Sequence, residues 1–151
     1  MLTWLWGLKG AFLYCVILCS VKQDPTISGN AGTGKVDYSE LKTKLRHELN
    51  INPHPDTVEE YRKQAEKAAE EAPRREDRAV FCQILASFYS HRANSSMAEK
   101  WIAEAERFSE GILSLEASTA YVRASLYQRE RLSRKALSVI EPYVGKLTDE
   151  K

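Results

Sequence analysis

The chain has 151 residues, 43% of them apolar, and carries 22 Lys and Arg against 21 Asp and Glu. This length supports about one domain with a modest core, and the near-neutral charge argues against a nucleic-acid binder, which needs a clustered basic surface. Seven Gly and five Pro are too few for a collagen-like or low-complexity chain. The composition therefore favours a packed helical body, and no reaction can be inferred from it.

The first 21 residues have the layout of an export signal or of an N-terminal membrane anchor. Lys9 precedes an unbroken apolar run over residues 10–19. A run of about ten to twelve residues covers only ~15–18 Å as a helix, short of the ~30 Å hydrocarbon layer, which favours a signal peptide. If Lys9 snorkels to the interface, residues 2–21 give a transmembrane helix with Trp4 and Trp6 near the headgroups.

The end of this segment bears on how it is processed. Cys19, with Val16 three residues earlier, resembles the lipobox of bacterial lipoproteins and is a candidate lipidation site, but Leu18 stands where that motif prefers Gly, Ala or Ser. Signal cleavage nearby meets large side chains where the protease requires small ones. Cleavage, lipidation and retention of residues 1–21 therefore all stay open. Removal of the segment would leave Cys82 as the one cysteine and exclude an intrachain disulfide.

Residues 22–36 are polar and glycine-rich, which predicts a flexible linker to the folded body. Within them, Gly29–Lys35 has the G-x-x-x-x-G-K spacing of a phosphate-binding loop. Val36 follows where Ser or Thr would supply a Mg²⁺ ligand, and Pro25 interrupts the segment that would be a buried strand. A nucleotide-binding protein using Gly29–Lys35 is therefore the alternative hypothesis.

From residue 37 to residue 147 the apolar pattern has a helical period and predicts about six helices. The third of them, near residues 76–92, is expected to form the centre of the core, since Phe81, Leu85 and Phe88 share one face. Capping-box spacing marks three helix starts and a serine marks a fourth: Asp37 with Glu40, Asp56 with Glu59, Ser96 with Glu99, and Ser133. Pro142 is expected to bend or end the last helix.

Two of the predicted helical hairpins repeat each other at an offset of 38 residues. Small residues let two antiparallel helices approach closely, while larger ones fill the space between successive hairpins. Residues 79–107 and 117–145 are therefore predicted to be two copies of one folding unit. Five positions match: Ala86, Tyr89, Ala98, Ile102 and Ala105 against Ala124, Tyr127, Ala136, Ile140 and Tyr143.

This pattern resembles the tetratricopeptide repeat (TPR) family, in which a small residue and then an aromatic three positions later mark the first helix of each pair. Ala86 with Tyr89 matches, as does its counterpart in the second copy. Tyr143 departs from the pattern, and the period exceeds the usual ~34 residues. The resemblance covers about residues 57–144, with a degenerate first hairpin. It implies an all-α, TPR-like stack of antiparallel helical hairpins.

The resemblance also implies a concave groove lined by the first helix of each pair. In that family such a groove holds an extended peptide or a helix of a partner protein. The Lys and Asn that clamp a terminal carboxylate in chaperone-tail receptors are not reproduced here by Gln83 and Ser87. The residues expected to face the groove are Gln83, Ser87, Ser90, His91, Tyr121, Ser125, Gln128 and Arg129.

Catalytic chemistry has no support in the sequence. His47, His54 and His91 lack the helical spacing of a metal site, and Cys82, next to Phe81, is expected to be a buried structural thiol. The sequence thus predicts a non-enzymatic protein–protein interaction adaptor with no cofactor or metal. We expect it on the periplasmic side of a bacterial cell envelope, exported or membrane-tethered, with a protein or peptide partner. A cytosolic, chaperone-like hairpin protein with a mispredicted start is a further alternative.

Overall fold

The computed structural model describes residues 36–146, which fold into six α-helices with no strand among them. A π-helical turn, η1 (His47–Ile51), extends the first of these helices, and a 3₁₀ turn, η2 (Glu141–Tyr143), follows the last. The prediction of an all-α fold with about six helices is confirmed. The helices are α2 (Tyr38–Arg46), α3 (Val58–Glu71), α4 (Arg75–His91), α5 (Ser95–Ser109), α6 (Leu113–Arg129) and α7 (Ser133–Ile140).

The predicted helix starts are confirmed at one position and corrected at three. Asp37 caps α2, because its Oδ1 accepts the backbone N–H groups of Ser39 (2.9 Å) and Glu40 (3.3 Å). Asp56 does not cap a helix: the N-cap residue of α3 is Thr57, no side chain caps that helix, and the N–H of Asp56 donates to Nδ1 of His54 (3.3 Å) within a turn. Helix α3 then begins two residues later, at Val58.

The starts of α5 and α7, the second helices of the last two hairpins, also differ from the prediction. Asn94 caps α5 by accepting the N–H of Met97 (3.2 Å), so the chain enters the helix before Ser96 can serve as a cap. Ser133 is itself the first residue of α7, and no side chain caps that helix. Pro142 lies in η2, and α7 ends at Ile140 as the proline predicts.

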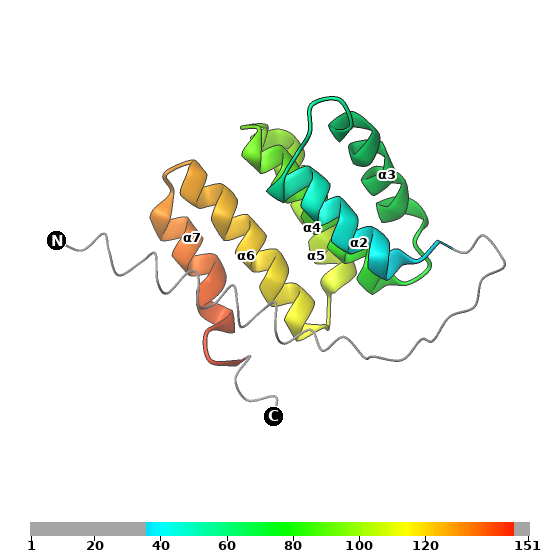
Figure 1. Cartoon of the computed structure of the whole chain (residues 1–151). Helices are drawn as coiled ribbons and strands as arrows, with labels where there is room; N and C mark the ends of the chain where they lie inside the picture. Colours follow the sequence, from blue (N-terminus) through cyan, green and yellow to red (C-terminus); the bar gives the residue numbers. More distant parts are fainter. Residues whose placement is uncertain (1–35, 147–151) are drawn as a thin grey trace. The chain divides into compact units, whose positions relative to one another are not determined.

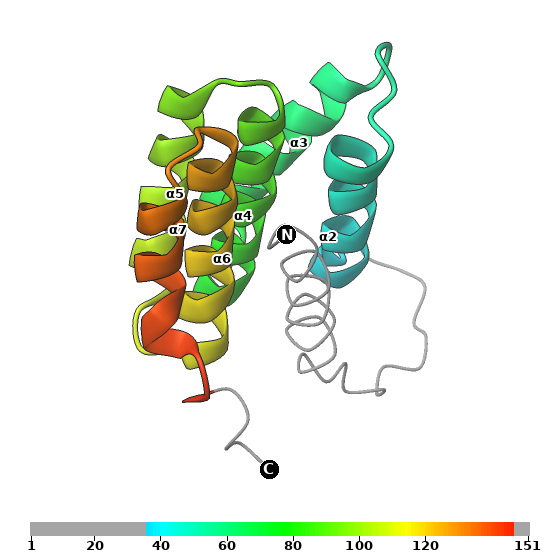
Figure 2. The same ribbon diagram turned by 90° about the vertical axis from the view of Figure 1, so that its left-hand side faces the viewer.

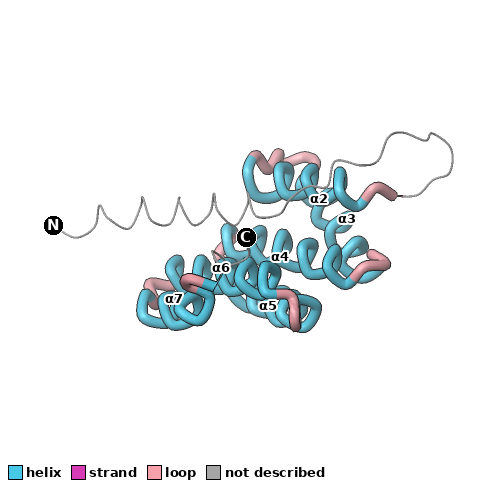
Figure 3. The backbone as a smooth tube through the Cα atoms, turned by 90° about the horizontal axis from the view of Figure 1, so that it is seen from below, coloured by secondary structure: helices cyan, strands magenta, loops and turns pink. Residues whose placement is uncertain are grey.

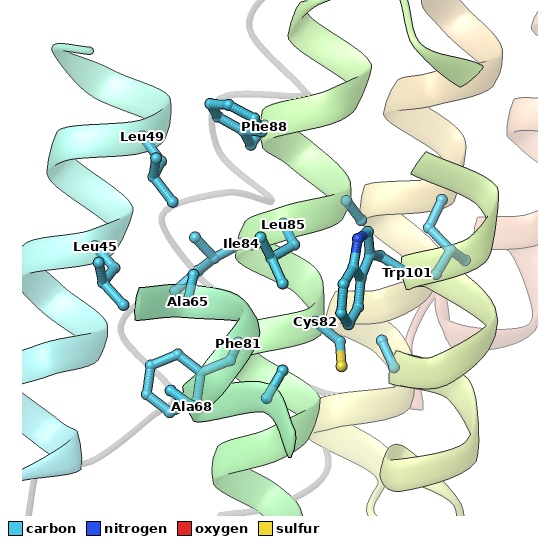
Figure 4. Close-up of a cluster of buried hydrophobic side chains, with 14 of the residues drawn as sticks. Leu45, Leu49, Ala65, Ala68, Phe81, Cys82, Ile84, Leu85, Phe88 and Trp101 are labelled. Atoms are coloured by element: carbon cyan, nitrogen blue, oxygen red, sulfur yellow. The ribbon is translucent and has the colours of Figure 1, made fainter. Parts of the chain in front are cut away.

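Helix α4 lies at the centre of the hydrophobic core, as the apolar pattern predicts. Phe81 and Leu85 are fully buried and Phe88 is 3% exposed. Figure 4 shows these α4 side chains between Leu49 of η1 on one side and Trp101 of α5 on the other. Burial of large apolar groups on both sides of one helix explains why α4 is the element around which the others pack.

The helices run in alternating directions and pack against their neighbours in sequence. Figure 1 shows α2, α4 and α6 running one way and α3, α5 and α7 the other. Helix α4 packs against α2, α3, α5 and α6, and α6 packs against α5 and α7. Figures 2 and 3 place α2 and α5 on opposite sides of α4. The first pair of helices, α2 and α3, is irregular, because α3 packs mainly against α4 and makes only a small contact with α2.

The turns inside the α4–α5 and α6–α7 hairpins have the same geometry. Ala93 and Arg131, which are 38 residues apart, both adopt a left-handed backbone, with φ of 55° and 61°. The N–H of Asn94 bonds to the carbonyl of Tyr89 (3.0 Å), and the N–H of Leu132 bonds to that of Tyr127 (2.8 Å). Each is a Schellman-type helix end, so the offset seen in the sequence recurs in the backbone.

Candidate functional site

The face shared by α4 and α6 carries the residues that the sequence predicted as a groove. Gln83 joins the two helices: its side-chain amide donates to Oγ of Ser118 and to Oγ1 of Thr119, each at 2.8 Å. Gln83 is only 7% exposed and Thr119 only 1% exposed. These bonds fix the register of α4 against α6, and they engage the Gln83 amide within the protein.

The remaining groove residues differ in their exposure along the two helices. On α4, Ser90 is buried, Ser87 is half-buried and His91 is exposed. On α6, Tyr121 and Ser125 are half-buried, whereas Gln128 and Arg129 are exposed. The accessible members of the set therefore gather at the C-terminal ends of α4 and α6.

Ser90 has an unusual environment for a hydroxyl group. It is 7% exposed, and its Oγ has no hydrogen-bond partner among the residues that the structure describes. Leaving a buried polar group unpaired costs about 1–3 kcal/mol. Ser125, on the neighbouring helix, satisfies its own Oγ by donating to the carbonyl of Tyr121 (3.0 Å).

The charge at this end of the two helices is positive. His91 and Arg129 occupy the last turns of α4 and α6, where cations are stabilised by the helix dipole. Partial burial lowers the pKa of His91, and the positive charges of Arg129 and Arg92 lower it further. The imidazole is therefore neutral near pH 7. The Arg92 guanidinium itself lies over the Phe88 ring, 3.8 Å from the ring centroid.

Two arginine-centred networks hold the helices behind this face. Arg62 of α3 pairs with Glu59 and Glu66 and donates to the hydroxyl of Tyr89 on α4 (3.4 Å). In the same way, Arg123 of α6 donates to the hydroxyl of Tyr127 (3.4 Å). It also pairs with two α5 carboxylates, those of Glu99 (2.8 Å) and Glu106 (2.9 Å).

A pocket of about 480 Å³ lies elsewhere, between the end of α5, the start of α6 and the α7–η2 segment. Burial raises the pKa of the Tyr143 hydroxyl, and the carboxylates of Glu116 and Glu106 raise it further. The sequence offered no signal for this pocket, because its walls come from three helix ends with no shared motif. The lining residues are Glu106, Arg107, Ser109, Glu110, Glu116, Ala120, Ser138, Val139, Pro142 and Tyr143.

Cys82 is confirmed as a buried thiol. It is 1% exposed, and burial raises its pKa to about 12. A thiol that stays protonated at neutral pH is a poor nucleophile and a poor metal ligand. Within residues 36–146, no three His, Cys, Asp or Glu side chains gather in a way that would hold a metal ion.

The sequence-based hypotheses for the N-terminal part of the chain lie outside the described residues. They are the signal or anchor of residues 1–21, the lipidation site at Cys19, the phosphate-loop spacing of Gly29–Lys35 and nearly all of the linker. For the part of the chain that the structure covers, none of the helices combines the length and the apolar character needed to cross a bilayer.

Comparison of the chain with protein-family models, curated proteins and solved structures finds no match.

Proposed function

We propose that the protein is a non-enzymatic adaptor of the TPR type, which binds a peptide or helix of a partner protein on the face shared by α4 and α6. The observation that carries the proposal is the pair of antiparallel hairpins, α4–α5 and α6–α7, related by an offset of 38 residues and by the same left-handed turn. Ala98 and Ala136, which are matched at that offset, are both buried, as close packing within each hairpin requires.

The polar character of this face supports a binding role. Two parallel helices joined by Gln83 carry the half-buried Tyr121 and the exposed side chains of Gln128 and Arg129 on a rigid support. The packed helices hold the backbone of these residues in place, so that binding a partner segment does not have to order it, which favours recognition. In this role Gln83 positions the two helices.

Site-specific photo-crosslinking tests the proposal. A photoreactive phenylalanine replaces Ser87 or Gln128 on the proposed face, or Ala103 on α5 as a matched control at an exposed helical position. We expect the same partner to be crosslinked from native membranes at the first two positions and not at Ala103. A Tyr121→Ala change should weaken that crosslink at least about fivefold, since aromatic contacts commonly dominate such surfaces.

Two outcomes would contradict the proposal. One is equal crosslinking from Ala103, which would mean that contacts at the α4–α6 face are not selective. The other is unchanged recovery of the partner with Tyr121→Ala, in a variant whose thermal unfolding matches that of the original chain.

The proposal retains the exported or membrane-tethered address, because residues 1–21 carry the layout of a signal or anchor. Cell fractionation tests this part separately. We expect the chain, or its processed form, in the envelope fractions of a bacterial host. Recovery of the full-length chain wholly in the cytoplasmic fraction would contradict the address and leave the binding face to be judged by crosslinking.

A further inference from the structure

The register of α4 against α6 brings the C-terminal ends of the two helices together. The helices run in the same direction, and Gln83 bonds to Ser118 and Thr119. Because parallel helices rise equally per residue, Ser90 lies level with Ser125, seven residues beyond each member of the Gln83–Ser118 pair. His91 and Arg129 then occupy the adjacent last turns.

This end of the face carries the guanidinium groups of Arg92 and Arg129, and Glu130 follows Arg129 at the end of α6. Among the described residues, neither Arg129 nor Arg92 forms an ion pair, and the charges that act on the His91 imidazole are these two guanidinium groups. Both His91 and Arg129 are exposed. An anion placed between them would meet two donors on separate helices.

The unpaired hydroxyl of Ser90 is a second, independent observation at the same place. Ser90 is more than nine-tenths buried, and its Oγ has no partner among the described residues. Ser90 shares a helix face with Ser87, since residues three apart on a helix are neighbours, and His91 is the next residue in the chain. A rotation about χ1 is enough to turn a serine hydroxyl toward an acceptor.

We propose that Arg129 and His91, with Ser90 as a further donor, form a subsite for a carboxylate side chain of an acidic segment in the partner protein. The inference rests on the proposed function and specifies the chemistry of the ligand. The planar guanidinium of Arg129 binds a carboxylate through two donors, and the neutral His91 ring donates one N–H. Binding of the anion favours the imidazolium form and therefore raises the pKa of His91.

The test uses the full chain in nonionic detergent, labelled with ¹³C at the histidine Cε1 atoms. The probe is a hexaglutamate peptide that is acetylated and amidated, so that it has no terminal charge, and the matched probe is hexaglutamine. We expect hexaglutamate alone to bind, and its affinity to fall at least about fivefold in Arg129→Gln, the size of an ion pair of roughly 1 kcal/mol. Arg134→Gln, at an exposed position of α7, controls for the loss of one positive charge.

The histidine signals give a readout that a change in folding alone would not. On saturation with hexaglutamate, the pKa of His91 should rise, while the signals of His47 and His54 should not respond to the peptide. Equal weakening by Arg134→Gln, or an unmoved His91 midpoint, would overturn the subsite. So would failure of hexaglutamate to bind at about 1 mM.

Failure of the subsite is distinguishable from failure of the proposed function. If crosslinks form selectively at Ser87 and Gln128 but Arg129→Gln leaves the affinity for the crosslinked partner unchanged, the adaptor role stands and the acidic-segment inference is wrong. If those crosslinks do not form, the adaptor role itself fails.

Discussion

The α4–α5 and α6–α7 hairpins share one turn geometry but bury very different side chains. The first contributes Phe81, Leu85 and Trp101 to the main hydrophobic cluster. From the second, Leu126 alone is a buried member of that cluster, and Ala136 is the one buried residue of α7. Helix α7 is also shorter than α5, the second helix of the first hairpin. It has no side-chain cap, and its Leu137 is 50% exposed.

This difference shows that a repeated backbone does not imply repeated stability. In a stack of hairpins each unit is stabilised by its neighbours, so a unit covered on both sides is held more strongly than one covered on a single side. Helix α4 is covered by α2, α3, α5 and α6, whereas α7 packs against α6 and η2. The α4–α5 hairpin should therefore open last and the α6–α7 hairpin first.

Removing a central side chain should have the largest effect. Leu85→Ala is expected to lower the free energy of unfolding by about 2–5 kcal/mol, because Leu85 is fully buried and its loss leaves a cavity. Leu137→Ala, at a half-exposed position of α7, should change it by less than about 0.5 kcal/mol. Chemical denaturation measures both, and similar losses in the two variants would remove the contrast between the hairpins.

The reactivity of Cys82 should report how tightly the first hairpin is closed. Burial raises the pKa of this thiol from 9.0 to about 12, so at pH 8 its thiolate is rarer than in the unfolded chain by at least about a hundredfold. We expect iodoacetamide to label Cys82 that much more slowly in the native chain than in denaturant, with Cys15 and Cys19 followed separately by peptide mass mapping. Rates within tenfold of each other would show that the hairpin opens freely.

The same thiol gives stability a defined dependence on pH. The unfolded chain loses the Cys82 proton near pH 9 and the folded chain only near pH 12. The contribution of the thiol is therefore complete below about pH 9 and is lost as the pH rises toward 12. In that window the free energy of unfolding should fall more steeply for the original chain than for Cys82→Ala.

The connection between the two hairpins should have an intermediate effect. Gln83→Ala removes three bonds to α6, those to the Leu115 carbonyl, Ser118 and Thr119, and leaves Thr119 with its remaining partners, Leu115 and Ser109. We expect a loss of about 1–3 kcal/mol in the free energy of unfolding. Gln128→Ala, at an exposed position of α6, is the control and should cost under about 0.5 kcal/mol. An unaffected Gln83→Ala variant would mean that packing alone sets the register.

The shared turn should give the smallest effect, and with the opposite sign. Ala93 and Arg131 adopt a left-handed backbone that glycine tolerates without steric cost, so Ala93→Gly and Arg131→Gly should each stabilise the protein by up to about 1 kcal/mol. Ala103→Gly, within α5, should instead destabilise it by about 0.5–1 kcal/mol. Thermal unfolding measures all three, and a loss of stability in both turn variants would contradict the left-handed geometry.

The pattern of apolar residues was enough to predict the elements, because a helix buries side chains at a fixed spacing. Phe81, Leu85 and Phe88 marked α4 as the central helix, and Pro142 marked the end of the last helix correctly. The capping boxes were less reliable. Asp56 has the right spacing, but its N–H is bonded to His54 in the preceding turn, and such competition is decided by the local backbone path.

The sequence by itself determined the helical class, the 38-residue offset and the buried state of Cys82, since each depends on spacing and apolarity along one chain. Tertiary structure alone decided which polar residues are accessible. Gln83 and Gln128 share a residue type, yet the first bonds to Thr119 and the second is exposed. The approach of α4 to α6 makes that difference, because hydrogen bonds between helices depend on register and distance.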